Sequence, residues 1–392
     1  MFDRSKIGFI GKWSLALDKK ILTMYFILLV LGCVFIFSSS VSVANRINIS
    51  NYYFFKNQLK FSIISVFIVL FLSVFNRDLL RKNTILIFLI SLVLLMLVPL
   101  IGFQTKGAKR WIYIFGISLQ PTEILKPTII LLNAFLLEKF TVLKEKKYLF
   151  ITLASYVFCI FFIYKQPDIG TLILITTVFF AQIFLTDFIN FKKILLAIPV
   201  FMLFFVIIYS TMPHVSGRIN NFLTSIKNPD KANYQVKRSI IAYQNAGLFG
   251  EGFMEGEIKN FIPDVHTDFI FPAITEEFGF VIVFCMLCLY FYTSVRIMLK
   301  AYLYNSKDTF TFLSLFGLSL LFVTQTSINI GVSLNLLPTK GMTLPFLSYG
   351  GSSIVGSSVL IGFVLILCKN TYLLDIKTED VLDLSCFNDI YR

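Results

Sequence analysis

The sequence is poor in charge and in histidine. Asp, Glu, Lys and Arg make up 15% of the 392 residues, whereas 57% are hydrophobic and 45 are phenylalanine. This apolar share is far above that of soluble globular domains, which excludes an ordinary soluble protein. The only two histidines, His214 and His266, are far apart and belong to no local pattern of carboxylates, so the sequence predicts no zinc site.

Cysteine is also scarce, and its placement excludes a disulfide framework. Every cysteine falls in an apolar run or in the last polar stretch, so the connections that would face an oxidising compartment have none to pair. Two of them form a CxxC pattern inside an apolar helix, where packing explains them. The six are Cys33, Cys159, Cys285, Cys288, Cys368 and Cys386.

Apolar runs long enough to cross a membrane recur along the whole chain. A helix needs roughly 20 residues to span about 30 Å of hydrocarbon. Alternation with a period of two, which is typical of membrane barrel strands, is absent. We therefore predict an all-α integral membrane protein with ten transmembrane helices. The predicted spans are 21–41, 58–75, 84–103, 117–137, 148–164, 168–186, 193–211, 270–295, 309–331 and 351–369.

Charge divides the chain into a head, a membrane domain and a tail. Residues 1–20 form a basic head without a small-residue cleavage site, residues 21–369 form the membrane domain, and residues 370–392 form the tail. Lys and Arg are more frequent on the side of both termini, which predicts that the N and C termini are cytoplasmic. The net charge of +13 then reflects this bias and attraction to anionic membrane lipid, and no pattern indicates nucleic acid.

Three polar stretches face the opposite compartment in this topology. Residues 212–269 are long, punctuated by Gly and Pro, and contain helical stretches with aromatic residues, so we expect a large structured extracytoplasmic loop. Residues 102–127 place lysines and Arg110 beside Trp111, a cluster suited to phosphates at headgroup depth. Residues 335–353 are interrupted by Gly and Pro, so their backbone must be buried in protein or line a polar cavity.

Charged residues also lie inside predicted spans. Glu123 and Lys126 are three residues apart on one helical face, where they can form an ion pair. Pro121 suits the first turn of that helix, whereas Pro127 predicts a kink or a restart. Such a pair either neutralises charge for packing or marks a functional site, because a charge at span centre costs about 2.5 to 3.5 kcal/mol. Asp168 begins another span, where we favour a capping role.

The stretch HTDFIFPAITEEFGF, residues 266–280, carries three acids at the start of a span. Pro272 places the start of this helix near Asp268, whose carboxylate could simply cap the first N–H groups. Glu276 and Glu277 lie two turns further on and point to different faces, so we expect one inside the bundle and the other with a separate partner. Capping does not require them, and a chemical role for Asp268 remains open.

Together, these stretches place a cationic cluster, a carboxylate under an ordered cap and irregular backbone at one face of the membrane. A lipid-linked substrate that carries phosphate would fit such a site. A translocation pathway would give much the same pattern, so residue types and spacing alone do not decide between them.

Five motifs stand in the order and spacing of a known family. They are GAKRWIYI with LQPTEILKP, then QPDIGT, YQVKRSIIAYQNAGLFGEG, HTDFIFPAITEEFGF and LLPTKGMTLPFLSYGGSS. Over roughly residues 13–369 the chain resembles the SEDS family of bacterial shape, elongation, division and sporulation proteins. The PTKG and TLPFLSYGGSS motifs are more similar to the division branch than to the elongation branch.

The resemblance implies an activity, a location and partners. It implies a peptidoglycan glycosyltransferase in the bacterial cytoplasmic (inner) membrane, at the division septum. Such an enzyme polymerises lipid II, the disaccharide pentapeptide linked to undecaprenyl diphosphate. The implied partners are a class B penicillin-binding protein and other proteins of the divisome.

The resemblance also implies a set of site residues. The family's essential aspartate falls on Asp268, the Glu and Lys of its QPxExxK motif on Glu123 and Lys126, its Arg-Trp pair on Arg110 and Trp111, and its PTKG lysine on Lys340. The chain departs from the family at Pro272, where a small residue is expected. This departure puts the shape of the first turn after Asp268 in doubt.

The implied mechanism is a single displacement. Asp268, as general base, would take the proton of the acceptor 4-hydroxyl while the diphosphate leaves from the donor sugar. Arg110, Lys126, Arg218 and Lys340 are the candidates for stabilising that leaving group, with Glu123 orienting Lys126. No cofactor is certain, and a divalent cation, Mg²⁺ or Mn²⁺, could accompany the diphosphate. A lipid II flippase and a non-catalytic divisome scaffold are the alternatives.

Overall fold

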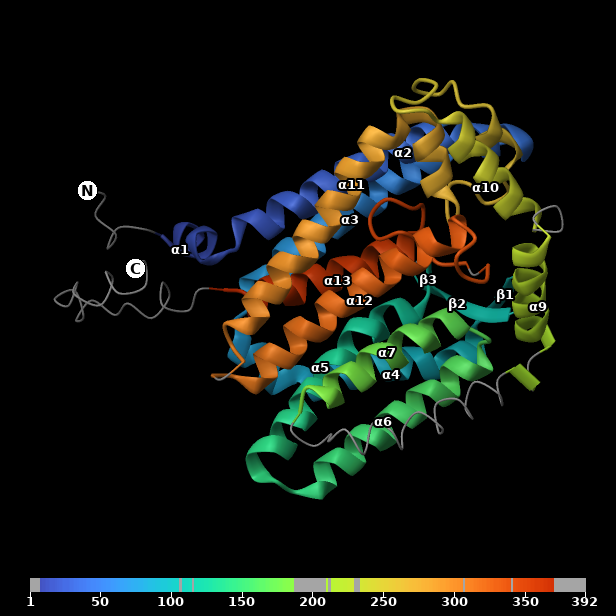
Figure 1. The fold of residues 1–392 in the computed structure, drawn as a ribbon. Helices are drawn as coiled ribbons and strands as arrows, with labels where there is room; N and C mark the ends of the chain where they lie inside the picture. Colours follow the sequence, from blue (N-terminus) through green and yellow to red (C-terminus); the bar gives the residue numbers. More distant parts are fainter. Residues whose placement is uncertain are drawn as a thin grey trace.

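The structure is a computed structural model, and it describes residues 8–105, 108–114, 116–186, 209–210, 213–228, 233–305, 307–339 and 341–369. Within these residues the chain forms helices and one small sheet (Figure 1). The helices are α1 (Phe9–Ala16), α2 (Lys19–Arg46), α3 (Tyr53–Val74), α4 (Arg77–Ile101), α5 (Pro121–Leu143), α6 (Lys146–Lys165), α7 (Ile169–Phe184), α9 (Pro213–Lys227), α10 (Tyr234–Asn245), the 3₁₀ helix η3 (Ile258–Phe261), α11 (Ile270–Tyr302), α12 (Thr309–Ser333) and α13 (Gly351–Leu367). The strands are β1 (Phe103–Thr105), β2 (Ala108–Ile114) and β3 (Ile117–Leu119).

The long helices form one bundle with two distinct ends. In Figure 1, α1 and the last turn of α13 lie at the left, whereas β1 to β3, α9 and α10 lie at the right. We call these the α1 end and the sheet end. Helix α5 occupies the centre, because it packs against α4, α6, α7, α12 and α13 and most of its residues are buried. The residues that α5 carries are therefore held from several sides.

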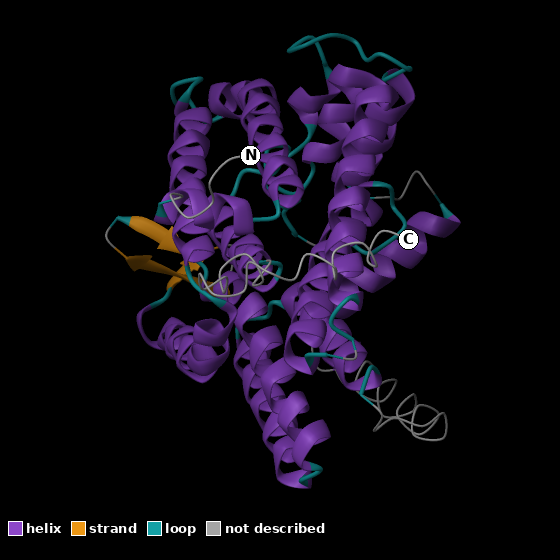
Figure 2. Ribbon diagram, turned by 90° about the vertical axis from the view of Figure 1, so that its left-hand side faces the viewer, coloured by secondary structure: helices purple, strands orange, loops and turns teal. Residues whose placement is uncertain are grey.

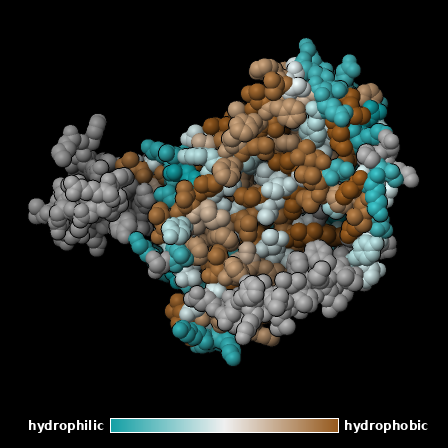
Figure 3. Space-filling model, viewed as in Figure 1, coloured by the Kyte–Doolittle hydropathy of each residue, from teal (hydrophilic) through white to brown (hydrophobic). Residues whose placement is uncertain are grey.

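The bundle turns apolar side chains outward and keeps polar side chains inside. On α3, Ser65 is buried while Phe67 exposes 69% of its surface. The Ser65 hydroxyl lies 2.7 Å from the Tyr25 hydroxyl and 2.6 Å from that of Ser358, so hydrogen bonds join α2, α3 and α13. Figure 3 shows apolar residues across the middle of one face and hydrophilic residues toward its two ends. This arrangement is the one that lipid as solvent requires.

The predicted all-α membrane fold is confirmed. Six described helices, α2, α3, α4, α6, α11 and α12, are long and apolar enough to cross a membrane, and α7 and α13 are apolar but shorter. Every predicted span except 193–211 overlaps a described helix. That span lies outside the described residues apart from 209 and 210, as does the tail 370–392, so the count of ten stays a prediction. Helix α4 begins at Arg77, earlier than the predicted 84, because polar residues continue it beyond the apolar run.

A small antiparallel sheet replaces the start of one predicted span. Strand β2 lies between β1 and β3, and Figure 2 draws this sheet in orange. Trp111 on β2 is paired with Phe103 on β1. The span predicted at 117–137 is wrong at its beginning, because Ile117–Leu119 is β3 and α5 starts at Pro121. Hydropathy does not distinguish a short apolar strand from the first turn of a helix. Proline at the first helical position marks the true start, since its missing N–H costs nothing there.

Helix α11 is interrupted at Gly279, which has φ 75° and ψ 175°. Glycine alone adopts this conformation readily. The break leaves backbone groups of residues 276–281 without helical partners, and residues 247–252 of the long loop supply them. Four backbone hydrogen bonds join the two segments, with N···O distances of 2.9 to 3.3 Å. The loop, which also contains α9, α10 and η3, is therefore joined by backbone hydrogen bonds to α11 at its break.

The two glutamates before the break fasten the loop from inside. The Glu276 carboxylate accepts hydrogen bonds from the N–H groups of Ile258 (2.6 Å) and Lys259 (2.9 Å) at the start of η3. The Glu277 carboxylate accepts from the Ser38 hydroxyl on α2 and pairs with the Lys259 ammonium. The expectation that only one glutamate lies inside is wrong, because both are buried and both bind η3. We call this contact the cap junction.

Candidate active site

Asp268 lies at the sheet end, immediately before α11. The helix begins at Ile270 with Phe269 at the N-cap, and no side-chain hydrogen bond is made at this cap. The predicted start near Asp268 is therefore two residues early, and Asp268 precedes the cap position. Pro272 lies in the first turn, as predicted, where the absence of its N–H is tolerated. Asp268 is thus not the N-cap residue of α11.

Two hydrogen bonds fix the backbone of Asp268. Its N–H donates to the Asp264 carbonyl (3.2 Å), and its carbonyl accepts from Nδ2 of Asn329 (3.0 Å). The same amide group of Asn329 donates to the Met342 carbonyl. Asn329 is a buried residue of α12. It therefore ties the chain before α11 to the irregular segment 334–350.

The irregular segment 334–350 passes directly beside the Asp268 carboxylate. A Cβ placed on Gly341 would lie only 2.8 Å from Oδ2 of Asp268. Within the segment, Leu344 and Phe346 are buried. The prediction of burial in protein is confirmed for residues 344–348, whereas Leu334, Leu336, Leu337 and Gly341 are exposed. Glycine at 341 lets the chain approach the acid this closely, since any side chain would occupy the space of the carboxylate.

Two arginines from different elements act electrostatically near Asp268. Arg218 belongs to α9 and Arg110 to β2. Although part of Arg218 is exposed to solvent, the protein around it lowers its pKa, the positive charge of Arg110 lowers the pKa further, and the negative charge of Asp268 raises it. Exposed charges influence one another only over short distances. The sheet end therefore brings together one acid and two cations from three separate parts of the chain.

Arg110 also anchors the turn before α7. Its Nε donates to the Gln166 carbonyl (2.8 Å) and its Nη2 to the Pro167 carbonyl (2.7 Å). A guanidinium has five N–H donors, so others remain for an anion. In the same turn, Asp168 accepts from the N–H of Thr171 (3.3 Å) and caps α7, which confirms the capping role predicted for it.

The predicted ion pair between Glu123 and Lys126 is confirmed, with 2.8 Å between Oε2 and Nζ. Both side chains are buried in α5. Lys126 Nζ also donates to Oε1 of Gln325 (2.9 Å), and Nε2 of Gln325 donates to the Thr343 carbonyl (3.1 Å). The pair is thereby linked through α12 to the segment 334–350. Its charges are compensated within the protein, as burial requires.

The helix does not restart at Pro127, because α5 continues through it to Leu143, and the kink stays a prediction. Pro127 has no N–H, so the carbonyl of Glu123 lacks its helical hydrogen bond. Helix α13 covers this carbonyl. A Cβ on Gly356 would lie 2.6 Å from this carbonyl oxygen. The small residues of α13 allow this close approach of the two helices. A neighbouring helix thus shields the group that proline frees.

The remaining predicted residues are less informative. Trp111 is half-buried on β2, next to Arg110. Lys340 lies outside the described residues. Sequence reasoning missed Gln325 and Asn329, although two amides four residues apart in an apolar helix face the same side and are a usable signal.

The described residues contain no group of three or more His, Cys, Asp or Glu side chains that could hold a metal ion. The predicted Mg²⁺ or Mn²⁺ could still be held by a diphosphate together with one carboxylate, which is how Mg²⁺ usually binds with phosphates. The arrangement around Asp268 can remove a proton and attract an anion. These are the two requirements for transferring a group from a diphosphate.

The fold and the site define a multi-pass membrane protein with an acid and two arginines at one end of its bundle. Residues 19–373 match the FtsW, RodA and SpoVE family, described as cell cycle protein. The chain belongs to this family. Among its relatives, the probable peptidoglycan glycosyltransferase FtsW of Caulobacter vibrioides is 32% identical over 94% of this chain and 93% of its own length. That of Haemophilus influenzae is 30% identical, with 90% of each chain covered.

Solved structures share the fold. A chain from a peptidoglycan synthase complex in which polymerization and crosslinking are coordinated superposes with a TM-score of 0.73 at 24% identity. The match covers 90% of this chain and 98% of that one. The rod shape determining protein RodA of Thermus thermophilus gives a TM-score of 0.66 at 22% identity, with 90% and 97% covered.

Proposed function

We propose that this chain is a peptidoglycan glycosyltransferase that polymerises lipid II into glycan strands during septal wall synthesis. The observation that carries the proposal is the placement of Asp268, Arg110 and Arg218 at the sheet end, in a fold shared with this family. The curated relatives carry the same activity in their names over nearly their whole length. We further propose a class B penicillin-binding protein as partner, supported by the likeness to a chain of a synthase complex.

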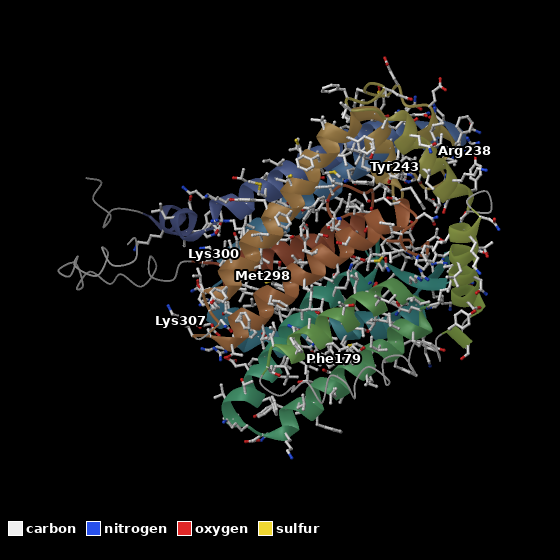
Figure 4. The ribbon with its side chains drawn as sticks, viewed as in Figure 1. Phe179, Arg238, Tyr243, Met298, Lys300 and Lys307 are labelled. Atoms are coloured by element: carbon white, nitrogen blue, oxygen red, sulfur yellow. The ribbon has the colours of Figure 1, made fainter. Side chains whose placement is uncertain are left out.

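We propose that the sheet end faces outward and the α1 end faces the cytoplasm. Basic residues gather at the α1 end, where Figure 4 labels Lys300 and Lys307, and Lys19 and Lys20 begin α2 there. An excess of Lys and Arg marks the cytoplasmic side of membrane proteins. In this orientation Asp268 meets the headgroup of a lipid-linked sugar in the outer leaflet.

In the proposed mechanism Asp268 is the general base. Its carboxylate takes the proton from the 4-hydroxyl of the acceptor GlcNAc while that oxygen attacks C1 of the donor MurNAc. The bond from C1 to the diphosphate oxygen breaks, and undecaprenyl diphosphate leaves with the electron pair. Inversion at C1 gives a β-1,4 bond. Arg218 and the unused donors of Arg110 stabilise the charge that develops on the leaving diphosphate.

We assign Glu123 and Lys126 a positioning role. Their ion pair is buried, and Lys126 directs its ammonium to Gln325, which in turn holds segment 334–350. A lysine with two protein partners is less suited to a leaving group than an exposed arginine. We therefore place Arg218 ahead of Lys126 as the diphosphate ligand, and Lys340 stays a candidate from the family motif.

The test is glycan polymerisation by the purified full-length protein with its penicillin-binding partner and labelled lipid II. Asp268→Asn should lower the rate at least about a hundredfold, because general-base catalysis contributes roughly 10² to 10⁴. Asp264→Asn is the matched control. It makes the same change four residues away, at φ 54°, a conformation that asparagine tolerates, and should stay within about twofold.

The alternatives give other results in the same experiment. A scaffold needs no carboxylate at position 268, so polymer of equal length and yield from Asp268→Asn would reject the assigned base. A lipid II flippase would move labelled lipid II across vesicles without making polymer. Transport without polymerisation by the complex would favour that alternative.

A further inference from the structure

A second cluster of charged residues surrounds a cavity at the α1 end, opposite Asp268. The cavity has a volume of about 450 Å³ and lies between α4 and α5. Its lining residues are Asp78, Arg81, Lys82, Phe135 and Lys139. The volume falls within the range of small-molecule sites, roughly 300 to 1,000 Å³. Three of the five lining residues are cations, and the proposed polymerisation reaction uses none of them.

Arg81 contacts two acids and an aromatic ring at the rim of this cavity. Its guanidinium pairs with Glu138 on α5 and lies 3.9 Å from Oδ1 of Asp308, just before α12. It also lies over the ring of Phe310, with 5.7 Å between Cζ and the ring centroid. Asp308 further pairs with Arg77 at 3.8 Å. Two arginines and two acids thus balance one another and fix the geometry of three elements.

The two lysines of the cavity are not balanced in this way. In the part of the chain that the structure describes, neither Lys82 nor Lys139 has a carboxylate partner within 4.0 Å. Lys139 Nζ lies over the rings of Phe135 (4.6 Å) and Tyr148 (5.5 Å), which hold it beside the cavity. Asp78 is the only acid in the lining. The cavity therefore keeps an excess of positive charge.

An apolar surface continues from the lysines along α4. Ile85, Leu86 and Leu89 expose 45%, 56% and 47% of their surfaces. They follow Lys82 at helical spacings of three, four and seven residues, so they extend the same face of the helix toward the membrane interior. A phospholipid has a charged headgroup and apolar acyl chains. The cations of the cavity, followed by exposed apolar residues on α4, match these two parts. A soluble phosphate would make no use of the apolar residues.

We propose that this cavity is a binding site for an anionic phospholipid headgroup. The phosphate binds Lys82 and Lys139, with Arg81 closing one side, and the acyl chains lie along Ile85 and Leu89. The carboxylate of Asp78 accepts a hydrogen bond from a headgroup hydroxyl, which favours phosphatidylglycerol over headgroups without one. Basic pockets between transmembrane helices on the cytoplasmic side recognise lipids in this way. The site is independent of the polymerisation reaction.

The test is lipid binding by the full-length protein in detergent, measured by native mass spectrometry in titrations with phosphatidylglycerol and phosphatidylcholine of identical chains. Each lysine near a membrane surface contributes about 1 kcal/mol, or about fivefold in affinity. The double variant Lys82→Gln/Lys139→Gln should therefore lose about thirtyfold in affinity for phosphatidylglycerol and little for phosphatidylcholine. Lys82→Arg/Lys139→Arg should keep the binding, which guards against a variant that fails to fold.

The matched control is Lys19→Gln/Lys20→Gln, which removes two exposed charges from α2 at the same end of the bundle. An equal loss of affinity in the control would show general charge attraction and overturn the site. Equal binding of the two lipids by the unchanged protein would do the same. Displacement of the lipid by free glycerol phosphate would show that the cavity binds a soluble ligand instead. If the double variant kept its lipid affinity but no longer bound the penicillin-binding protein, the cavity would instead be a binding site for that protein.

Discussion

The cap junction and the surroundings of Asp268 use acids from one short stretch in opposite ways. At the junction, Glu276 accepts from two backbone N–H groups and Glu277 from a hydroxyl and an ammonium. Around Asp268, the hydrogen bonds to Asn329 and Asp264 involve its backbone, while its negative charge acts on Arg218. The two acids of the cap junction hold the loop to α11. Asp268 lies where its charge acts on a cation, and we propose that it is placed there for chemistry.

The comparison predicts that variants at the two places fail in different assays. A junction variant should lose stability and, through that, activity. A variant near Asp268 should stay folded and lose turnover. Thermal unfolding in detergent and glycan polymerisation, measured on the same preparation, separate the two outcomes.

The largest effect is expected for Glu277→Ala at the cap junction. Lys259 and Glu277 expose only 4% and 2% of their side chains, so the substitution leaves a buried ammonium without its partner. Removing one member of a buried pair costs about 3 to 5 kcal/mol. The midpoint of thermal unfolding should fall accordingly.

Two further variants sharpen this prediction. Lys259→Met/Glu277→Gln removes both charges and leaves an acceptor for Ser38, so it should be more stable than Glu277→Ala. Glu255→Ala removes an exposed acid of the same loop and should change stability by less than about 0.5 kcal/mol. If Glu277→Ala unfolds at the wild-type temperature, the junction does not hold the loop.

A smaller effect, and on turnover alone, is expected for Arg218→Gln. The side chain lies partly exposed on α9, so its loss should leave the unfolding midpoint unchanged. If Arg218 stabilises the departing diphosphate, polymerisation should slow about ten- to a hundredfold. Lys227→Gln, an exposed cation on the same helix, is the control and should keep the wild-type rate. Equal rates for both variants would remove Arg218 from the site.

The sequence predicted what depends on apolar length and on local spacing. Spans such as 309–331 follow from hydropathy, and the pair of Glu123 with Lys126 follows from helical geometry. The break at Gly279 was not predicted, because a glycine in an apolar run is also compatible with a continuous helix. Its reason lies in residues 247–252, whose backbone groups complete the broken turn.

The candidate site was predicted less completely than the fold. Asp268 came from the family motif, and spacing alone left a capping role open for it. The spacing of Gln325 and Asn329 indicates only that they share one face of α12, whereas their partners are carbonyl groups of residues distant in sequence. Such contacts depend on tertiary packing, and an isolated amide in a span has several explanations.

The smallest effect, and the one that most sharpens the comparison, is expected for Asn329→Ala. One amide holds the carbonyls of Asp268 and Met342, so its loss frees the acid and its neighbouring segment to move apart without removing a charge. A positioning role predicts that kcat falls about tenfold while KM changes less than about twofold, because misplacement acts mainly on the transition state. Ser327→Ala, on the exposed face of the same helix, should leave both constants unchanged. A rise in KM at constant kcat would instead place Asn329 in substrate binding, and no change in either constant would show that the backbone of Asp268 is held without it.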